Sequence, residues 1–227
     1  FYRLMPHGAM VALFGGAFIY ALVAMAMAAR SFWRDGAPAD AVATLRDVWR
    51  AAGDTLRLRY LDGGGEVCSV DPEARVDRRR LFHHLAFYGF LLCFAATSVA
   101  TVYHYVLGRE APYPWYDLPV ALGTVGGIGL AIGPIGLWLQ KQTVGIGPGR
   151  GATGMDVAFI AMLFLCGATG LLLLALRGTP AMGTLLALHL GVVFAFFLAM
   201  PYSRFVHGIF RFAALVRYAH ERRQQRS

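Results

Sequence analysis

The sequence is poor in charged residues, which make up only 15% of its 227 positions, whereas 57% are hydrophobic. An ordinary soluble domain carries about 25% charged residues. The mean hydropathy is also positive, at +0.53. This composition excludes a typical soluble protein and indicates one that crosses a membrane several times.

Cysteine is scarce as well, with Cys68, Cys93 and Cys166 the only examples. They form no CxxC or CxxCH motif, which excludes a covalently attached c-type haem and an iron–sulfur cluster ligated within this sequence. Cys93 and Cys166 fall in apolar stretches, where a thiol packs as a small core residue. The sequence also lacks HExxH and any histidine–carboxylate cluster, which argues against a catalytic metal, and it shows no acid, base or nucleophile constellation.

Five apolar runs are each long enough to cross a bilayer, which takes about 20 residues. We therefore predict an all-α, polytopic integral membrane protein with five transmembrane helices in a bundle, forming a single transmembrane domain over residues 1–227. The predicted spans cover about residues 9–29, 82–107, 117–140, 155–176 and 182–207. A cytoplasmic loop is expected at 31–80 and a basic C-terminal tail at 208–227. The first run has no clear cleavage site, so it reads as a span and not a signal peptide.

Within the loop 31–80, apolar and basic residues alternate at helical spacing. The apolar set is Val42, Leu45, Val48, Trp49, Ala52 and Leu56, and the basic set beside or opposite it is Arg46, Arg50, Arg57 and Arg59. This pattern predicts an amphipathic helix that lies on the membrane surface or against a partner. A plain solvated helix is the alternative.

The third predicted span is rich in glycine. Its small residues are Gly123, Gly126, Gly127, Gly129, Gly133 and Gly136, and Pro134 lies among them. Small residues let membrane helices approach closely, and they also leave room for a flat macrocycle; the two interpretations are compatible. The fourth span, 155–176, is expected to carry no ionisable group and to act as scaffold. The fifth is expected to continue as a helix through Tyr218, bent at Pro201.

Basic residues are distributed very unevenly between the predicted loops. The segments 30–80, 141–150 and 204–227 hold 18 of the 21 lysines and arginines, and only Arg3, Arg109 and Arg177 fall on the other side. By the positive-inside rule, the loop 31–80 and the C-terminus are cytoplasmic. The net charge of +8 is thus explained by topology and does not indicate nucleic-acid binding.

Histidines interrupt two of the apolar runs: His83, His84 and His104 in the second span, and His189 and His207 in the fifth. An ionisable residue in a span is costly, so its default interpretation is functional. The two spans run antiparallel, which places His83 level with His207 and His104 level with His189. His7 and His220 are not expected to be ligands.

Helical phase refines the choice of histidines. At about 100° per residue, the 18 residues between His189 and His207 return to the same helix face. The 21 residues between His83 and His104 leave the two side chains about 60° apart around the helix axis, and the 20 residues between His84 and His104 leave them about 160° apart. His83 is therefore favoured, and His84 is the alternative.

Two histidine pairs, each at one depth in the membrane, can provide the axial ligands of two b-type haems. Two imidazoles fill the coordination sphere of the iron, so the haem exchanges electrons and does not bind oxygen. Arg204 and Arg211, three residues before and four after His207, lie on nearly the same helix face and suit the propionates. Arg78, Arg79 and Arg80 lie near the same level. Arg109 with Tyr103 or Tyr105 would serve the other haem.

The competing hypothesis is a cofactor-free membrane anchor or small transporter whose histidines are structural or proton-relay groups. Proton coupling more often brings Asp or Glu into the spans. The predicted cores of spans one, two, four and five contain none.

Three segments carry a family resemblance: FYRLMPH, RRRLFHHLAFYGFLLCFAATSVATVYHY and GMDVAFIAMLFLCGATGLLLLALR. They resemble the membrane half of the tricarballylate-utilisation protein B (CitB-like) family. Five spans with histidines on the second and fifth are also similar to the gamma subunit of respiratory nitrate reductase.

The resemblance implies an electron-transfer component of an oxidoreductase complex in the bacterial cytoplasmic membrane. Electrons would pass between a flavin-dependent tricarballylate dehydrogenase and membrane quinone, through iron–sulfur clusters and b-type haem. In the family those clusters sit in an N-terminal ferredoxin-like module. The first residue here is Phe1, so we expect the sequence to begin inside a longer chain, with the module upstream or on a separate partner.

Overall fold

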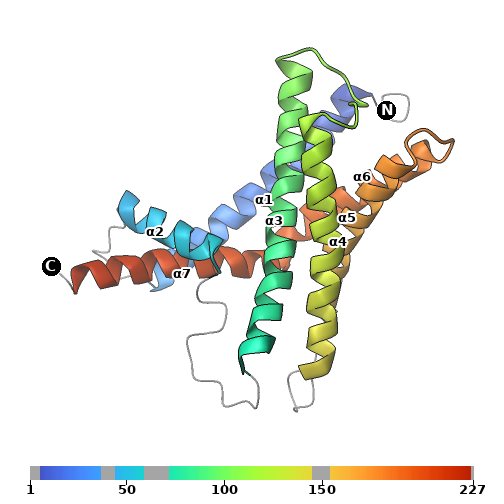
Figure 1. Ribbon diagram of the computed structural model, residues 1–227. Coiled ribbons are helices and arrows are strands. Elements are labelled where there is room, and N and C mark those ends of the chain that lie inside the picture. Colours follow the sequence, from blue (N-terminus) through green and yellow to red (C-terminus); the bar gives the residue numbers. More distant parts are fainter. Residues whose placement is uncertain (1–5, 37–43, 59–71, 145–153, 226–227) are drawn as a thin grey trace. The chain divides into compact units, whose positions relative to one another are not determined.

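The chain is mainly helical in the part described by a computed structural model, namely residues 6–36, 44–58, 72–144 and 154–225. These residues form seven α-helices and one short 3₁₀-helix, and no strand occurs among them (Figure 1). In chain order they are α1 (His7–Gly36), α2 (Leu45–Leu56), α3 (Pro72–Tyr105), α4 (Leu118–Val144), α5 (Gly154–Ala175), α6 (Met182–Ala199), η1 (Met200–Tyr202) and α7 (Arg204–Gln224). The all-α prediction is confirmed.

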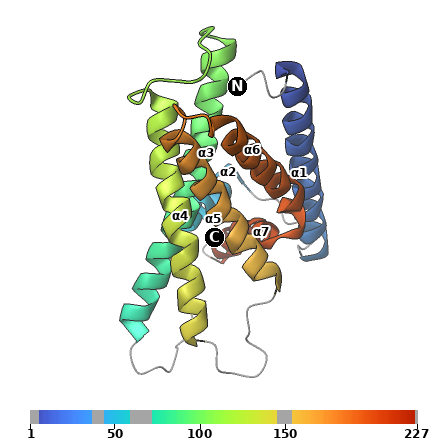
Figure 2. The same cartoon turned by 90° about the vertical axis from the view of Figure 1, so that its right-hand side faces the viewer.

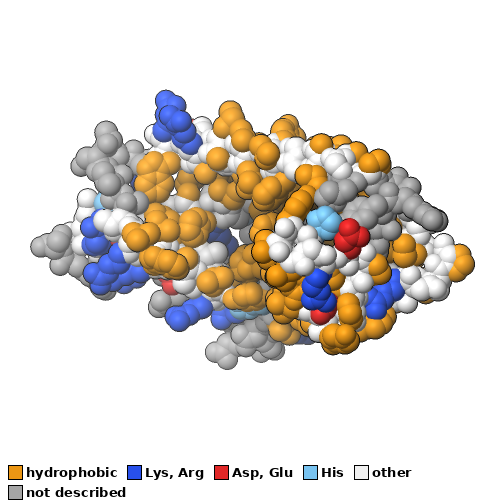
Figure 3. Space-filling model, turned by 90° about the horizontal axis from the view of Figure 1, so that it is seen from above, with side chains coloured by type: hydrophobic (Ala, Val, Ile, Leu, Met, Phe, Trp, Pro, Cys, Tyr) orange, Lys and Arg blue, Asp and Glu red, His pale blue; other side chains and the backbone are white. Residues whose placement is uncertain are grey.

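Five of the helical stretches are long and apolar enough to cross a membrane: Gly8–Asp35, Arg78–Tyr105, Leu118–Gln140, Gly154–Ala175 and Met182–Tyr202. Large apolar side chains remain exposed along them, such as Ile19, Val102 and Val125. Figure 3 shows apolar side chains spread over the molecular surface in one view. Exposed apolar surface on helices with internally satisfied backbones is suited to lipid, which confirms the prediction of a five-span membrane protein.

The chain divides into two compact units, which we describe separately. The first unit comprises residues 1–16 and 77–196, and the second comprises 17–76 and 197–227. The first therefore contains α4, α5 and most of α3 and α6, whereas the second contains α2, η1 and α7. The assignment of residues 1–227 to a single domain stays a prediction.

In the first unit, glycines bring the α4 backbone against α3, and the two helices lie side by side in Figures 1 and 2. A Cβ added at Gly133 would lie 2.6 Å from the backbone nitrogen of Ala86, and one at Gly129 would lie 2.7 Å from the carbonyl oxygen of Leu85. At Gly136 an added Cβ would overlap the ring of Phe82. The glycine-rich face is thus filled by α3, which favours helix packing over room for a macrocycle.

A second glycine contact joins α4 to α5. An added Cβ at Gly167 of α5 would lie 2.8 Å from the carbonyl oxygen of Gly127 on α4. Neither a longer side chain nor even alanine fits there without a backbone shift. The three helices α3, α4 and α5 consequently form the close-packed part of this unit.

The fifth predicted span, 182–207, is too long. Helix α6 ends at Ala199, Pro201 lies in η1, and the spanning stretch ends at Tyr202. Ser203 is extended, with φ −97° and ψ 178°, and its Oγ accepts a hydrogen bond from the backbone N–H of Phe205 at 3.2 Å. The chain therefore starts a new, capped helix at Arg204, where a bend in one continuous helix was expected.

That new helix, α7, occupies most of the predicted tail 208–227. The predicted loop 31–80 is also largely helical where described. It contains the end of α1 up to Gly36, all of α2, and the start of α3 from Pro72.

In the second unit, α2 is the amphipathic helix expected in the loop, and it packs against α7. Its start is held by Asp47, whose Oδ2 accepts hydrogen bonds from the backbone N–H and the hydroxyl of Thr44, at 2.9 and 2.7 Å. The first of these bonds satisfies a backbone N–H group that a helix start otherwise leaves open. The partner that covers one side of this helix is thus a segment of the same chain.

Candidate functional site

Within the predicted spans, the best-defined polar contact is the one that His189 on α6 makes. Its Nδ1 lies 2.9 Å from the Oγ1 of Thr169 on α5, and the Thr169 side chain is buried. Both residues belong to the first unit. One of the four predicted ligands is therefore held by a specific contact from a neighbouring helix.

The hydrogen bonds of Thr169 are compatible with one tautomer of His189 in particular. The Thr169 hydroxyl has one proton, and its oxygen lies 2.6 Å from the carbonyl oxygen of Leu165, one helical turn earlier. When the hydroxyl donates its proton to that carbonyl, its oxygen accepts a hydrogen bond from His189, which corresponds to the tautomer with the ring proton on Nδ1. The lone pair of His189 is then on Nε2, the nitrogen remote from Thr169.

Space for the imidazole ring comes from Gly170. A Cβ added there would lie 3.1 Å from Cε1 of His189, which is tighter than an ordinary van der Waals contact. Thr169 and Gly170 together position the ring against α5. The prediction that α5 acts only as scaffold assigned no role to Thr169 or Gly170. A Thr-Gly pair in an apolar span is a weak sequence signal, because either residue is common at plain helix contacts.

The expectation that this span has no ionisable group is also wrong. Asp156 lies in the first turn of α5 and is buried. An acidic residue is favourable at that end of a helix because of the helix dipole.

His104 lies near the end of α3, in the same unit as His189. Its ring is half-buried and lies edge-on to Tyr105, with ring centroids 5.0 Å apart. Helix α3 is continuous from Pro72 to Tyr105, so the helical phase that relates His104 to His83 applies. His83 and His84 are both half-buried, and the His84 ring stacks on Tyr88 at 5.7 Å.

His207 lies on α7, in the second unit, and is exposed. The phase relation of 18 residues to His189 does not apply, because Ser203 interrupts the helix between them. Arg204 and Arg211 do share α7 with His207, so their expected spacing on one face is retained. The pairing of His207 with His83 stays a prediction.

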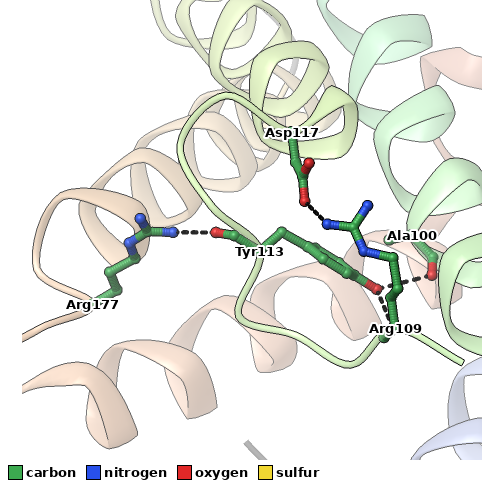
Figure 4. Close-up of polar contacts among 5 residues, drawn as sticks. All are labelled: Ala100, Arg109, Tyr113, Asp117 and Arg177. Atoms are coloured by element: carbon green, nitrogen blue, oxygen red, sulfur yellow. Dashed lines mark hydrogen bonds and ion pairs between the residues drawn. The ribbon is translucent and has the colours of Figure 1, made fainter.

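The loop between α3 and α4 is fixed by a polar cluster made of Arg109, Tyr113, Asp117 and Arg177 (Figure 4). Arg109 forms an ion pair with Asp117, and its guanidinium lies 4.8 Å from the ring centroid of Tyr103. Asp117 is buried at the start of α4. The guanidinium that was expected beside the second haem is therefore engaged in holding this loop.

The same cluster reaches the connection between α5 and α6. Arg177 donates a hydrogen bond to the carbonyl oxygen of Tyr113 at 2.6 Å and lies 3.9 Å from the ring centroid of Trp115. The Tyr113 hydroxyl lies 3.1 Å from the carbonyl oxygen of Ala100 on α3. The cluster thus ties together the ends of α3, α4 and α5 within the first unit.

Comparison with known proteins gives two findings. A family model described as citrate utilization protein B matches residues 1–227. A curated protein of that name from Escherichia coli is 46% identical over 226 residues, which is 99% of this chain and 59% of the relative. The chain therefore spans well under two thirds of that relative's length. No solved structure matches.

Proposed function

Because the chain belongs to the citrate utilization protein B family, we propose that it serves the oxidation of citrate, tricarballylate or a related organic acid as a membrane electron-transfer subunit. In this proposal it relays electrons between a flavin-dependent, iron–sulfur-containing dehydrogenase on the cytoplasmic side and the membrane quinone. The relay uses two b-type haems, as in the gamma subunit of nitrate reductase that the histidine pattern resembles. The iron–sulfur clusters belong to a module or partner outside this sequence.

The observation that carries the proposal is the state of His189. A histidine that ligates a metal donates its other ring N–H to an acceptor, which fixes the ring and raises its basicity. Thr169 provides that acceptor, and Nε2 is left with a lone pair. The donor chemistry at this position therefore fits an axial haem ligand.

The other residues have supporting roles. His104 would provide the second ligand at the level of His189, and His83, or His84 in its place, would pair with His207. Arg204 and Arg211 would neutralise the propionates beside His207. A bis-histidine haem supplies one-electron exchange without an open coordination position.

Localisation follows from the charge distribution. With 18 of 21 basic residues in alternate segments, the loop before α3 and the C-terminus would face the cytoplasm of a bacterium. A soluble dehydrogenase that oxidises an organic acid in that compartment would meet the chain on the same side.

The deciding experiment is a reduced-minus-oxidised absorption spectrum with a haem count on the purified chain. We expect a b-type spectrum and two haems per chain. His189→Ala and His104→Ala should each remove the same haem, and the double variant should lose no more than either single one. His7→Ala is the control and should keep both haems. Full haem content in His189→Ala and His104→Ala would refute the pairing.

The same preparation tests the cofactor-free alternative. If protein made with ample haem shows no b-type spectrum, the electron-relay proposal fails. Uptake of citrate into vesicles containing that haem-free protein would then support a transporter.

A further inference from the structure

Helix α2 exposes large apolar side chains and buries a carboxylate. Leu45 is 73% exposed and Trp49 is 70% exposed, whereas Asp47 is fully buried and Ala51 nearly so. A helix on the surface of a soluble domain shows the opposite arrangement, with its apolar side toward the core. The inverted arrangement needs an apolar environment outside the fold.

The two sides are separated by helical geometry. At about 100° per residue, Trp49 lies about 40° from Leu45 around the helix axis, and Val48 about 60° on its other side. Asp47 lies about 200° from Leu45, on the opposite side. The apolar stripe of α2, which we define as Leu45, Val48 and Trp49, therefore points away from α7.

Contacts of the buried Asp47 carboxylate with α7 hold α2 in this rotation. The Asp47 carboxylate lies 3.2 Å from the guanidinium of Arg223 and 3.7 Å from Nδ1 of His220, both on α7. Arg223 also lies 2.9 Å from that Nδ1. Turning α2 to bury Trp49 would separate Asp47 from these partners, and breaking a buried ion pair is strongly unfavourable.

The chain keeps α2 close to the membrane. Helix α1, which contains the first span, ends at Gly36, and α2 begins at Leu45. Nine residues reach at most about 32 Å even when fully extended. Helix α7, on which α2 rests, begins two residues after the fifth span ends at Tyr202. Both helices of the pair are thus tethered to the ends of spans.

The charges beside the apolar stripe indicate that the apolar environment is an anionic lipid membrane. Arg46, Arg50 and Arg57 lie about 100–140° from Leu45, along one edge of the apolar stripe. Arginines there are at the level of lipid phosphates when the stripe enters the acyl region, and tryptophan favours the same interface. We propose that α2 lies in the headgroup layer of an anionic phospholipid membrane, with Leu45, Val48 and Trp49 buried in lipid and the arginines on the phosphates.

The proposal is tested with the full chain in nanodiscs containing phosphatidylglycerol. Single cysteines replace Trp49 or Arg50 in a chain without Cys68, Cys93 and Cys166, and each carries a spin label. At position 49 we expect relaxation by oxygen to exceed relaxation by a water-soluble nickel chelate several-fold. Position 50 is the matched control and should show the reverse preference.

Two results would overturn the proposal. Equal access of the nickel chelate to positions 49 and 50 would mean a solvated helix. Protection of position 49 from both reagents would mean that protein, not lipid, covers the stripe. The unsubstituted chain provides a second measurement: phosphatidylglycerol, compared with phosphatidylcholine alone, should slow hydrogen exchange of α2 backbone amides several-fold. Unchanged exchange would also contradict the proposal. Neither measurement depends on haem.

Discussion

At the scale of single residues, the contact between Thr169 and His189 explains how an imidazole is prepared inside an apolar helix. The Thr169 hydroxyl donates a hydrogen bond to the carbonyl oxygen of Leu165 and lies 2.9 Å from Nδ1 of His189, so one small side chain contacts two groups. Gly170 leaves the space that the ring needs. A histidine ring held in this way cannot rotate freely, so its other nitrogen, Nε2, points in one fixed direction.

Removing the acceptor should weaken the proposed ligand. In Thr169→Val, the Nδ1–H of His189 loses its partner, so the imidazole becomes a poorer donor. We expect haem affinity at this position to fall about 10–100-fold and the reduction potential of that haem to rise. Haem titration and a redox titration measure the two effects. Thr169→Ser keeps the hydroxyl and should behave like the parent chain; identical titrations of Thr169→Val and the parent would contradict the role of Thr169.

At the scale of elements, α3 and α4 approach closely enough for backbone contact at glycines. Gly129 and Gly133 lie against the α3 backbone, where an added Cβ would come within 2.7 Å and 2.6 Å of it. Close approach increases van der Waals contact, which is a main source of helix association in lipid. Helix α3 carries His83 and His104, so this contact also positions two proposed ligands.

Substituting a glycine at the contact between α3 and α4 should show how closely the two helices pack. Gly133→Ala places a methyl group 2.6 Å from a backbone nitrogen of α3, so the helices must separate. We expect a loss of about 1–3 kcal/mol in unfolding free energy. Gly123→Ala is the matched control, because its added Cβ would lie 3.7 Å from Ala96 at ordinary contact distance. Unfolding in mixed detergent micelles measures both, and equal stability of the two variants would argue against a tight α3–α4 contact.

The contact between α2 and α7 depends on a charge, so it should depend on pH. Burial tends to raise the pKa of Asp47, but the two hydrogen bonds from Thr44 and the charges of Arg223 and His220 outweigh it, and the pKa falls below its ordinary value of 3.8. A carboxyl whose pKa is lowered by folding stabilises the fold above its unfolded pKa. That stabilisation is lost as the pH falls from 3.8 through the lower folded pKa.

The distance between spin labels at the exposed residues Arg50 and Tyr218 should report this change. We expect one narrow distance at neutral pH, and a broad distribution below pH 3.8 as α2 leaves α7. Asp47→Asn removes the titrating charge and should broaden the distribution already at neutral pH. A narrow distance in Asp47→Asn at every pH would show that the ion pair does not hold the helix.

At the scale of the whole molecule, five spans place the two ends of the spanning region on opposite sides of a membrane. The basic residues then predict, by the positive-inside rule, which side is cytoplasmic. Only Arg3, Arg109 and Arg177 fall in the segments assigned to the outer side, and two of them are engaged in the polar cluster of the α3–α4 loop. The proposed docking of a cytoplasmic dehydrogenase requires this orientation.

Cysteine labelling in intact cells tests the orientation. In a cysteine-free chain, Glu110→Cys should react with a membrane-impermeant maleimide, because the positive-inside rule predicts that the loop before α4 faces outward. Arg222→Cys on α7 should react only after the membrane is permeabilised. The opposite pattern would invert the topology and remove the cytoplasmic docking side.

The sequence by itself determined the helical membrane fold, the five spans and the family. Apolar runs of the required length have few alternative structures in lipid, because every backbone polar group must be satisfied within the helix. It also placed His104 and His189 in spans and marked α2 as amphipathic.

Only the tertiary structure decided which surfaces meet. The role of Thr169 was not predicted, because it depends on α5 lying beside His189. A contact between two helices produces little recognisable pattern in the sequence of either helix. The break at Ser203 was missed because the apolar pattern continues across it into α7. Asp47 of α2 faces inward because Arg223 and His220, over 170 residues later, pair with it. Helical periodicity locates an apolar stripe, but only the packed partner determines which side of the helix it covers.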